Sequence, residues 1–175
     1  MENIEFTINP IDKKLAKQIT DLIIENTNPE NENTNFCKYY DVNKFTNKKF
    51  KSESNFSILH LNIASLQFHF EDLTIMLQVL DYSFDIIAIT ESKLQKGLNP
   101  VKDINLPNYQ YLHTPTEASK GGTLIYISNK LIYKPRTDLE IYQAKDIEST
   151  FTEILMPKGK NIVGCIYKHH TIDQN

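Results

Sequence analysis

The 175-residue sequence is poor in cysteine and contains no tryptophan. Its two cysteines, Cys37 and Cys165, are far apart and belong to no CxxC or Cys/His pattern, which argues against a zinc site or a disulfide framework. Free thiols are typical of a reducing compartment. We therefore expect an intracellular protein, of the nucleus or the cytoplasm.

Membrane and secretory signals are missing as well. The longest apolar runs cover only a few residues, whereas a membrane-spanning helix needs about 20. The opening stretch MENIEFTINP lacks the basic and apolar regions of a signal peptide. We therefore expect a soluble chain with no membrane partner.

The chain also lacks an excess of basic charge. It has 19 Lys and Arg against 22 Asp and Glu, a net charge of −3, which argues against a purely electrostatic nucleic-acid binder. An enzyme that holds a divalent cation in an acidic cleft is compatible with this balance. With 40% hydrophobic residues, 9 Tyr and 9 Phe, there is enough apolar material for one folded domain and an appendage.

Residues 1–55 differ in composition from the rest, and ten of them are Asn. Asn9-Pro10 can open a short helix, and residues 26–35 form a polar linker. Residues 37–45 contain an aromatic cluster that can pack on a neighbour. The composition favours a poorly ordered leader over 1–55.

A strand, a helix and a second strand are predicted next. Residues 56–62 are rich in apolar side chains, and 84–91 contain the unbroken apolar run 86–89 of a strand covered on both faces. Between them, Ser65 is the predicted N-cap of a helix. Such a βαβ unit has parallel strands. The helix has apolar residues three or four positions apart: Leu66, Phe70, Leu73, Leu77 and Leu80.

The remaining sequence predicts antiparallel strands, and hence an α+β or layered αββα fold. The turn signals are Gly121-Gly122, Asn129-Lys130 and Lys158-Gly159. The strands are expected at 109–114, 123–128, 132–136, 149–155 and 161–168.

Two polar residues end the two parallel strands, Asn62 the first and Glu91 the second. Because ligands gather at the carboxyl ends of such strands, both side chains are expected to face one cleft. A carboxylate there suits Mg²⁺ or Mn²⁺, and an amide beside it can orient a phosphate or a water. Alternatively, Glu91 begins a solvated loop and Asn62 caps the helix turn. The spacing leaves both interpretations open.

Five segments, taken in order, resemble the endonuclease/exonuclease/phosphatase domain of LINE-type (non-LTR) retrotransposons. The first two resemble the Asn-containing opening motif and the Thr-Glu motif of that family. The others resemble a Gly-rich approach to a later strand and the strand pair that ends in an active-site Tyr. They are LHLNIASL (59–66), IIAITES (86–92), GGTLIYIS (121–128), ESTFTEI (148–154) and NIVGCIYK (161–168).

The resemblance implies an α+β fold, a truncated portion of a four-layer αββα sandwich of the DNase I type, over residues 56–175. It implies that Glu91 binds Mg²⁺ or Mn²⁺, that Asn62 contacts the metal-bound water or the phosphate, and that Tyr167 lies near the scissile phosphate. Ser65 and Lys168 are candidate substrate contacts. The implied reaction is nicking of target DNA, and the implied partners are DNA and a reverse transcriptase domain of the same polyprotein.

The sequence departs from the family pattern in three respects. Ala64 stands where the LINE-type motif usually has Arg, and Lys168-His169-His170 stand where Arg-Pro-Pro usually follows the Tyr. The family's Asp/Asn and Asp-His catalytic groups lie beyond the Tyr strand and have no equivalents here. We therefore expect the second sheet to be largely missing, apolar surface to be uncovered, and this chain to be inactive by itself.

Two further functions stay open. One is a catalytically inactive remnant or binding module of the same fold, and the other is a phosphatase or sphingomyelinase-like member of the superfamily. Among the histidines, His60 is expected to be a buried or half-buried, hydrogen-bonded residue and His113 a loop residue. His169 and His170 with Asp173 form only a weak candidate for a metal site.

Overall fold

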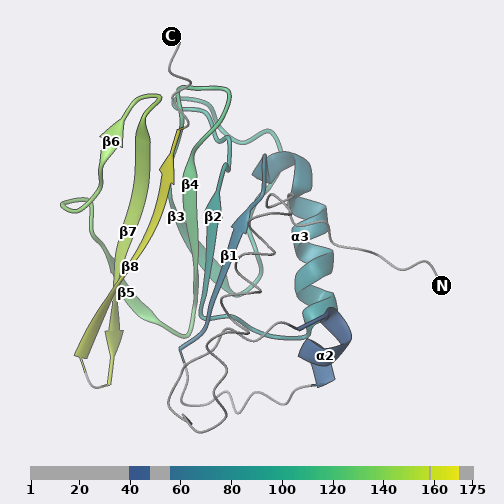
Figure 1. Ribbon diagram of the computed structural model, residues 1–175. Helices are drawn as coiled ribbons and strands as arrows, with labels where there is room; N and C mark the ends of the chain where they lie inside the picture. Colours follow the sequence, from purple (N-terminus) through teal and green to yellow (C-terminus); the bar gives the residue numbers. More distant parts are fainter. Residues whose placement is uncertain (1–39, 48–55, 158, 170–175) are drawn as a thin grey trace, which may run out of the picture. The chain divides into compact units, whose positions relative to one another are not determined.

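The computed structural model describes residues 40–47, 56–157 and 159–169, which form two four-stranded sheets and two helices (Figure 1). This confirms the α+β class. The elements are α2 (Val42–Asn47), β1 (Ile58–Asn62), α3 (Leu66–Leu80), β2 (Ile86–Thr90), β3 (Tyr109–Thr114), β4 (Thr123–Ser128), β5 (Ile132–Pro135), β6 (Tyr142–Gln143), β7 (Ile147–Met156) and β8 (Gly159–Lys168).

The first sheet has the strand order β1-β2-β4-β3, and β1 and β2 are parallel, as the predicted βαβ unit requires. Every residue of β2 is buried. Ile87 and Ile89 pack in a cluster with Leu73 of α3, whereas Ile86 and Ala88 pack in a second cluster against the other sheet. The unbroken apolar run of β2 therefore has the cause that was predicted, because both faces of the strand are covered.

The second sheet consists of β5, β6, β7 and β8, and the prediction that it would be largely missing was wrong. β7 and β8 are ten residues each and form a long antiparallel pair. Their inward side chains Ile154, Val163 and Cys165 face the first sheet. The described layers thus follow the order helix, sheet, sheet, as in part of an αββα sandwich. The expected uncovered apolar residues are present and include Ile132, Leu155, Ile162 and Ile166.

Helix α3 begins at Leu66 as predicted, but Ser65 does not cap it with its side chain. Ser65 has a φ of 152°, outside the negative-φ conformation in which a cap hydroxyl reaches the N–H groups of the first turn. The Leu66 N–H instead donates to the carbonyl of Ser92 at 2.9 Å. The start of α3 is therefore tied to the segment that follows β2.

Helix α2 lies within the Asn-rich stretch and was not predicted. Its Phe45 ring packs against Tyr82 and Phe84, with centroid distances of 5.8 and 6.3 Å, so the expected packing of the aromatic cluster on a neighbour is confirmed for this residue. Residues 1–39, with the expected short helix and linker, and residues 48–55 lie outside the described residues. Neither described helix is long and apolar enough to cross a membrane.

Candidate functional site

The carboxyl ends of β1 and β2 bring Asn62 and Glu91 together, as the βαβ geometry predicts. Asn62 is paired with Thr90 in the parallel register, so Glu91 lies one residue further along the same edge. The Asn62 Nδ2 donates a hydrogen bond to Glu91 Oε1 at 3.1 Å. The Asn62 side chain is exposed and that of Glu91 is half-buried, so a ligand can reach both.

The backbone around Glu91 is held from two sides. The N–H groups of Ser92 and Lys93 donate to the carbonyls of Gly122 and Gly121 at 3.1 and 2.9 Å, and Ser92 also accepts from the start of α3. Glu91 itself has a φ of 54°, a left-handed conformation that a non-glycine residue keeps only where its surroundings impose it. The carboxylate is therefore carried on a constrained segment.

Tyr167 reaches the same carboxylate from the second sheet. Its hydroxyl donates to Glu91 Oε1 at 3.3 Å. Burial raises the pKa of this hydroxyl, and the charge of Glu91 and the hydrogen bond to it act in the same direction. Because alternate residues of a strand point to one face, Tyr167 shares the inward face of β8 with Val163 and Cys165.

The two candidate substrate contacts do not join this group. Lys168 is exposed and follows Tyr167 in β8, which places it on the outward face of the second sheet. Ser65 is half-buried at the start of α3. Its backbone carbonyl accepts from the His69 N–H at 3.1 Å. Within the described part of the chain, no hydrogen bond connects Ser65 or Lys168 with Asn62, Glu91 or Tyr167.

Sequence reasoning missed Glu148 and attached only a weak metal-site idea to His169. The Glu148 side chain is fully buried at the start of β7, where the Gly122 N–H donates to its Oε2. His169 Nε2 lies 3.4 Å from Glu148 Oε1. The sequence signal that could have identified Glu148 is its position in β7. It lies an even number of residues from Thr150, Thr152 and Ile154, and it therefore shares their inward face.

Near the site the space between the sheets is polar. Thr150 Oγ1 donates to Thr114 Oγ1 at 3.0 Å and lies 2.8 Å from Thr123 Oγ1. The Thr114 hydroxyl in turn donates to the Ser149 carbonyl at 2.7 Å. These buried hydroxyls pair with one another. The apolar inter-sheet core therefore gives way to a hydrogen-bonded polar layer toward the Glu91 end.

Two histidine predictions need correction. His60 is exposed, although it was expected to be buried or half-buried, because β1 is an edge strand whose His60 face is open. Its Nε2 lies 3.4 Å from the Thr90 hydroxyl, so the expected hydrogen bond is present but long. His113 belongs to β3 and not to a loop. Neither residue contacts Glu91 among the described interactions.

Among Asn62, Glu91 and Tyr167, the Glu91 carboxylate is the side chain that could bind a cation. Among the described residues, no group of three or more His, Cys, Asp or Glu side chains is arranged to hold a metal ion. The two hydrogen bonds to Glu91 both end on Oε1. Oε2 therefore carries no hydrogen bond from the described residues and is the oxygen that suits a hard cation.

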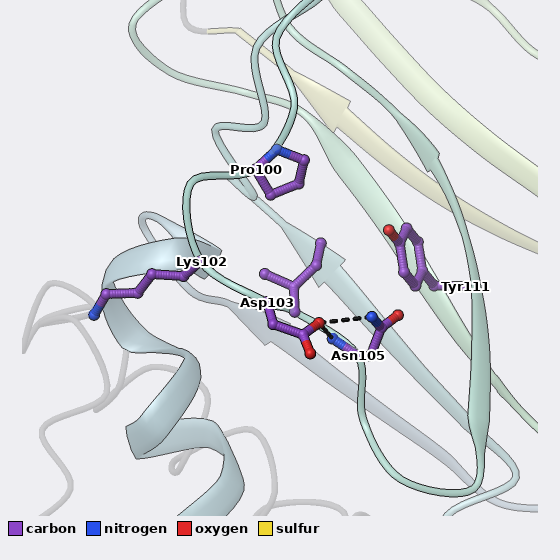
Figure 2. A pocket seen from close by; sticks show the side chains of 6 residues that line it. Pro100, Lys102, Asp103, Asn105 and Tyr111 are labelled. Carbon is purple, nitrogen blue, oxygen red and sulfur yellow. Dashed lines mark hydrogen bonds between the residues drawn. The ribbon is translucent and has the colours of Figure 1, made fainter.

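A separate pocket lies beside the loop that precedes β3 (Figure 2). The Asp103 carboxylate in this pocket accepts from the backbone and side-chain nitrogens of Asn105 at 2.9 and 2.6 Å. These hydrogen bonds stabilise the local turn. Asn62, Glu91 and Tyr167 do not line it. The lining residues are Pro100, Lys102, Asp103, Ile104, Asn105 and Tyr111.

No protein-family model matches the sequence, and no curated protein matches it. Among solved structures, the chain is similar to the AP endonuclease LMAP from Leishmania major, at 11% identity and a TM-score of 0.48, over 77% of this chain and 52% of that one. It is also similar to the 3′ phosphatase NExo from Neisseria, solved with a product DNA hairpin, at 14% identity and a TM-score of 0.39, over 62% and 40%. The chain thus spans about half the length of these structures or less.

Proposed function

We propose that this chain carries part of the active site of a divalent-metal-dependent endonuclease that hydrolyses phosphodiester bonds in DNA. The observation that carries the proposal is the meeting of Asn62, Glu91 and Tyr167 at one atom, Glu91 Oε1. These are the residues that the motif resemblance assigns to the reaction. Asn62 ends β1, Glu91 directly follows β2 and Tyr167 lies in β8 of the other sheet, so their convergence supports a common role.

The residues present fit Mg²⁺ or Mn²⁺. Mg²⁺ is usually bound through one or two carboxylates and keeps several waters, so a single half-buried carboxylate with one open oxygen is a suitable ligand. Glu91 would hold the ion through Oε2. When bound, the cation would stabilise negative charge on the phosphate and on the leaving oxygen.

The neighbouring side chains would position the substrate. The exposed Asn62 amide can donate to a phosphate oxygen or orient a water while its Oδ1 accepts from the Ala64 N–H at 3.3 Å. The Tyr167 hydroxyl is protonated at neutral pH because the ordinary pKa of a tyrosine is about 10, and burial raises the pKa of this one further. The hydroxyl is therefore a hydrogen-bond donor that can turn from Glu91 to a phosphate oxygen.

The binding step can be tested with the chain as it is. Mn²⁺ affinity would be measured by titration calorimetry and electron paramagnetic resonance for the wild type, Glu91→Gln and the control Glu71→Gln. The control makes the same charge change at an exposed position of α3. We expect Glu91→Gln to weaken binding at least about tenfold, or ~1.4 kcal/mol, and Glu71→Gln to leave it unchanged. Equal affinity of all three proteins would contradict the metal role of Glu91.

We further propose that the enzyme is part of a retrotransposon protein and nicks target DNA. Its partner would be a reverse transcriptase domain of the same polyprotein. The support is the LINE-type form of the five motifs in this order. The test is to read the genomic sequence after codon 175. Gly-Asp-Phe-Asn and Ser-Asp-His motifs followed by reverse transcriptase sequence are expected, and unrelated sequence there would count against the proposal.

A second candidate is a catalytically inactive binding module, and Ala64 favours it. This exposed residue stands where the LINE-type motif usually has Arg, whose guanidinium could pair with a carboxylate or a phosphate, and Ala cannot. The assay is nicking of supercoiled plasmid by the 175-residue chain with Mg²⁺ or Mn²⁺, beside DNA binding measured by fluorescence anisotropy. DNA binding without nicking supports the module, whereas nicking that Glu91→Gln abolishes rules it out. Preferential hydrolysis of phosphoinositides would indicate the phosphatase or sphingomyelinase-like class.

A further inference from the structure

A buried acid and an imidazole lie directly beside Tyr167. Glu148 is opposite Tyr167 in the β7–β8 register, and its side chain is 0% exposed. The His169 side chain is 11% exposed, and its Nε2 is 3.4 Å from Glu148 Oε1. Neither of these two atoms has a hydrogen-bond partner of good geometry among the described residues. A buried carboxylate is costly unless a neighbouring group compensates it, and the imidazole is the group placed to do so.

The backbone at Gly121 leaves room for this pair. A Cβ atom at Gly121 would overlap the Glu148 carboxylate and lie 2.7 Å from His169 Nε2, so only glycine permits the pair to pack there. The same two-glycine segment donates its Gly122 N–H to Glu148 and accepts from the N–H groups of Ser92 and Lys93. Glu148 is thus connected through Gly122 to the segment that carries Glu91.

His169 is also fixed against the Tyr167 ring. The backbone N–H of His169 donates to the Asp146 carbonyl at 2.7 Å, which extends the β7–β8 ladder by one residue. Its ring meets that of Tyr167 edge-on, with centroids 4.9 Å apart and an interplanar angle of 81°. The Tyr167 ring therefore has His169 on one side and Glu91 at its hydroxyl.

We propose that His169, held by the buried carboxylate of Glu148, is a positioning residue that sets the orientation of the Tyr167 ring toward Glu91. This deepens the proposed function and rests on it for its biological meaning. His169 is not assigned a catalytic role, because its buried Nε2 faces Glu148 rather than Glu91. The LINE-type pattern usually has proline at the position of His169. The contact of an imidazole with Glu148 and Tyr167 is therefore a feature of this sequence and not of that pattern.

The test follows the Tyr167 ring by NMR and requires no metal and no activity. The ¹H–¹³C signals of the Tyr167 ring would be assigned by their loss in Tyr167→Phe. The quantity measured is the change in their chemical shift that Glu91→Gln causes. It would be measured in the wild type, in His169→Ala, in Glu148→Gln and in His113→Ala, a control at an exposed histidine. We expect the shift to be at least about twofold smaller in His169→Ala and Glu148→Gln. His113→Ala should keep the full shift.

A general loss of structure would not imitate this pattern, because the signals of Tyr109 and Tyr126 in the first sheet serve as internal references. If His169→Ala does not fold, His169→Phe keeps an edge-on ring without the nitrogen and should give an intermediate response. The wild type provides a direct check, a nuclear Overhauser effect between the His169 and Tyr167 rings. Its absence, or an undiminished shift in His169→Ala, overturns the proposal. Unchanged Mn²⁺ affinity in Glu91→Gln would instead overturn the proposed function alone.

Discussion

The Tyr167 hydroxyl donates a hydrogen bond to Glu91 Oε1 at 3.3 Å, and the two residues are 76 positions apart in the chain. Glu91 belongs to the edge formed by β1 and β2, whereas Tyr167 comes from β8 of the second sheet. The candidate site therefore lies where the two sheets meet. Any substitution that shifts one sheet against the other should disturb it.

Tyr167→Phe should lower the free energy of unfolding by about 0.5–1.5 kcal/mol, because one hydrogen bond is lost while the ring still packs. Urea denaturation of the wild type, Tyr167→Phe, Glu91→Gln and the double variant measures the coupling between the two groups. Tyr133→Phe, which removes an exposed hydroxyl bonded to Gln110, is the control and should show no coupling to Glu91→Gln. Strictly additive effects of the Tyr167 and Glu91 changes would contradict the bond.

Gly121→Ala should destabilise the protein more than Gly97→Ala. Both glycines have positive φ, 98° and 76°, so both substitutions carry backbone strain. A Cβ at Gly97 meets nothing within 4 Å, whereas one at Gly121 meets Glu148 and His169. Overpacking adds about 1–3 kcal/mol. Thermal and urea unfolding would measure the difference, and equal losses would argue against a tightly packed Glu148–His169 pair.

Cys165 should make stability fall at alkaline pH. Burial raises the pKa of its thiol to about 11, above the unfolded value of roughly 8.5. Between these values the unfolded chain loses the proton and the folded chain keeps it, so stability is full below the unfolded pKa and declines as pH rises toward 11. Urea unfolding at several pH values should show a shallower decline for Cys165→Ala.

The wild type and Cys165→Ala are compared by how steeply the free energy of unfolding falls with pH. The absolute free energies are not compared, because Cys165→Ala also leaves a cavity. The half-buried Tyr109 and the buried Tyr126, whose pKa values burial also raises, contribute to the decline in both proteins. Identical slopes would mean that Cys165 is not buried in the folded protein. A thiol reagent at pH 8 should likewise modify Cys165 only after unfolding.

Thr150→Val should destabilise the protein by about 1–3 kcal/mol, because the Thr114 and Thr123 hydroxyls would lose a buried hydrogen-bond partner. The matched change Thr74→Val removes a half-buried hydroxyl whose one hydrogen bond among the described residues goes to the Phe70 carbonyl in the preceding helical turn. It should cost less than about 1 kcal/mol. Chemical denaturation of both variants measures the difference. A smaller loss for Thr150→Val than for Thr74→Val would show that the polar layer is not tightly hydrogen-bonded.

Local patterns predicted most of the elements correctly. β1, α3 and β2 follow from apolar spacing, and the strands at 109–114 and 123–128 agree with β3 and β4. The two-residue β6 has no sequence pattern of its own, since it exists only through its pairing with β7. The capping role of Ser65 failed for a related reason, because the Leu66 N–H at the start of α3 donates to the carbonyl of Ser92, 26 positions further along the chain.

The sequence by itself determined that Asn62 and Glu91 share one edge, because two parallel strands joined by a single helix must end on the same side of their sheet. Strand alternation also places Tyr167 on the same face of β8 as Val163 and Cys165, and it places Glu148 on the same face of β7 as Thr150, Thr152 and Ile154, although Glu148 was not singled out from the sequence. Only the tertiary structure decided that these faces meet the first sheet. Strand alternation is a local property, whereas the packing of two sheets depends on long-range contacts. That packing brings the Tyr167 hydroxyl to Glu91, and it brings the Glu148 and His169 side chains next to Gly121.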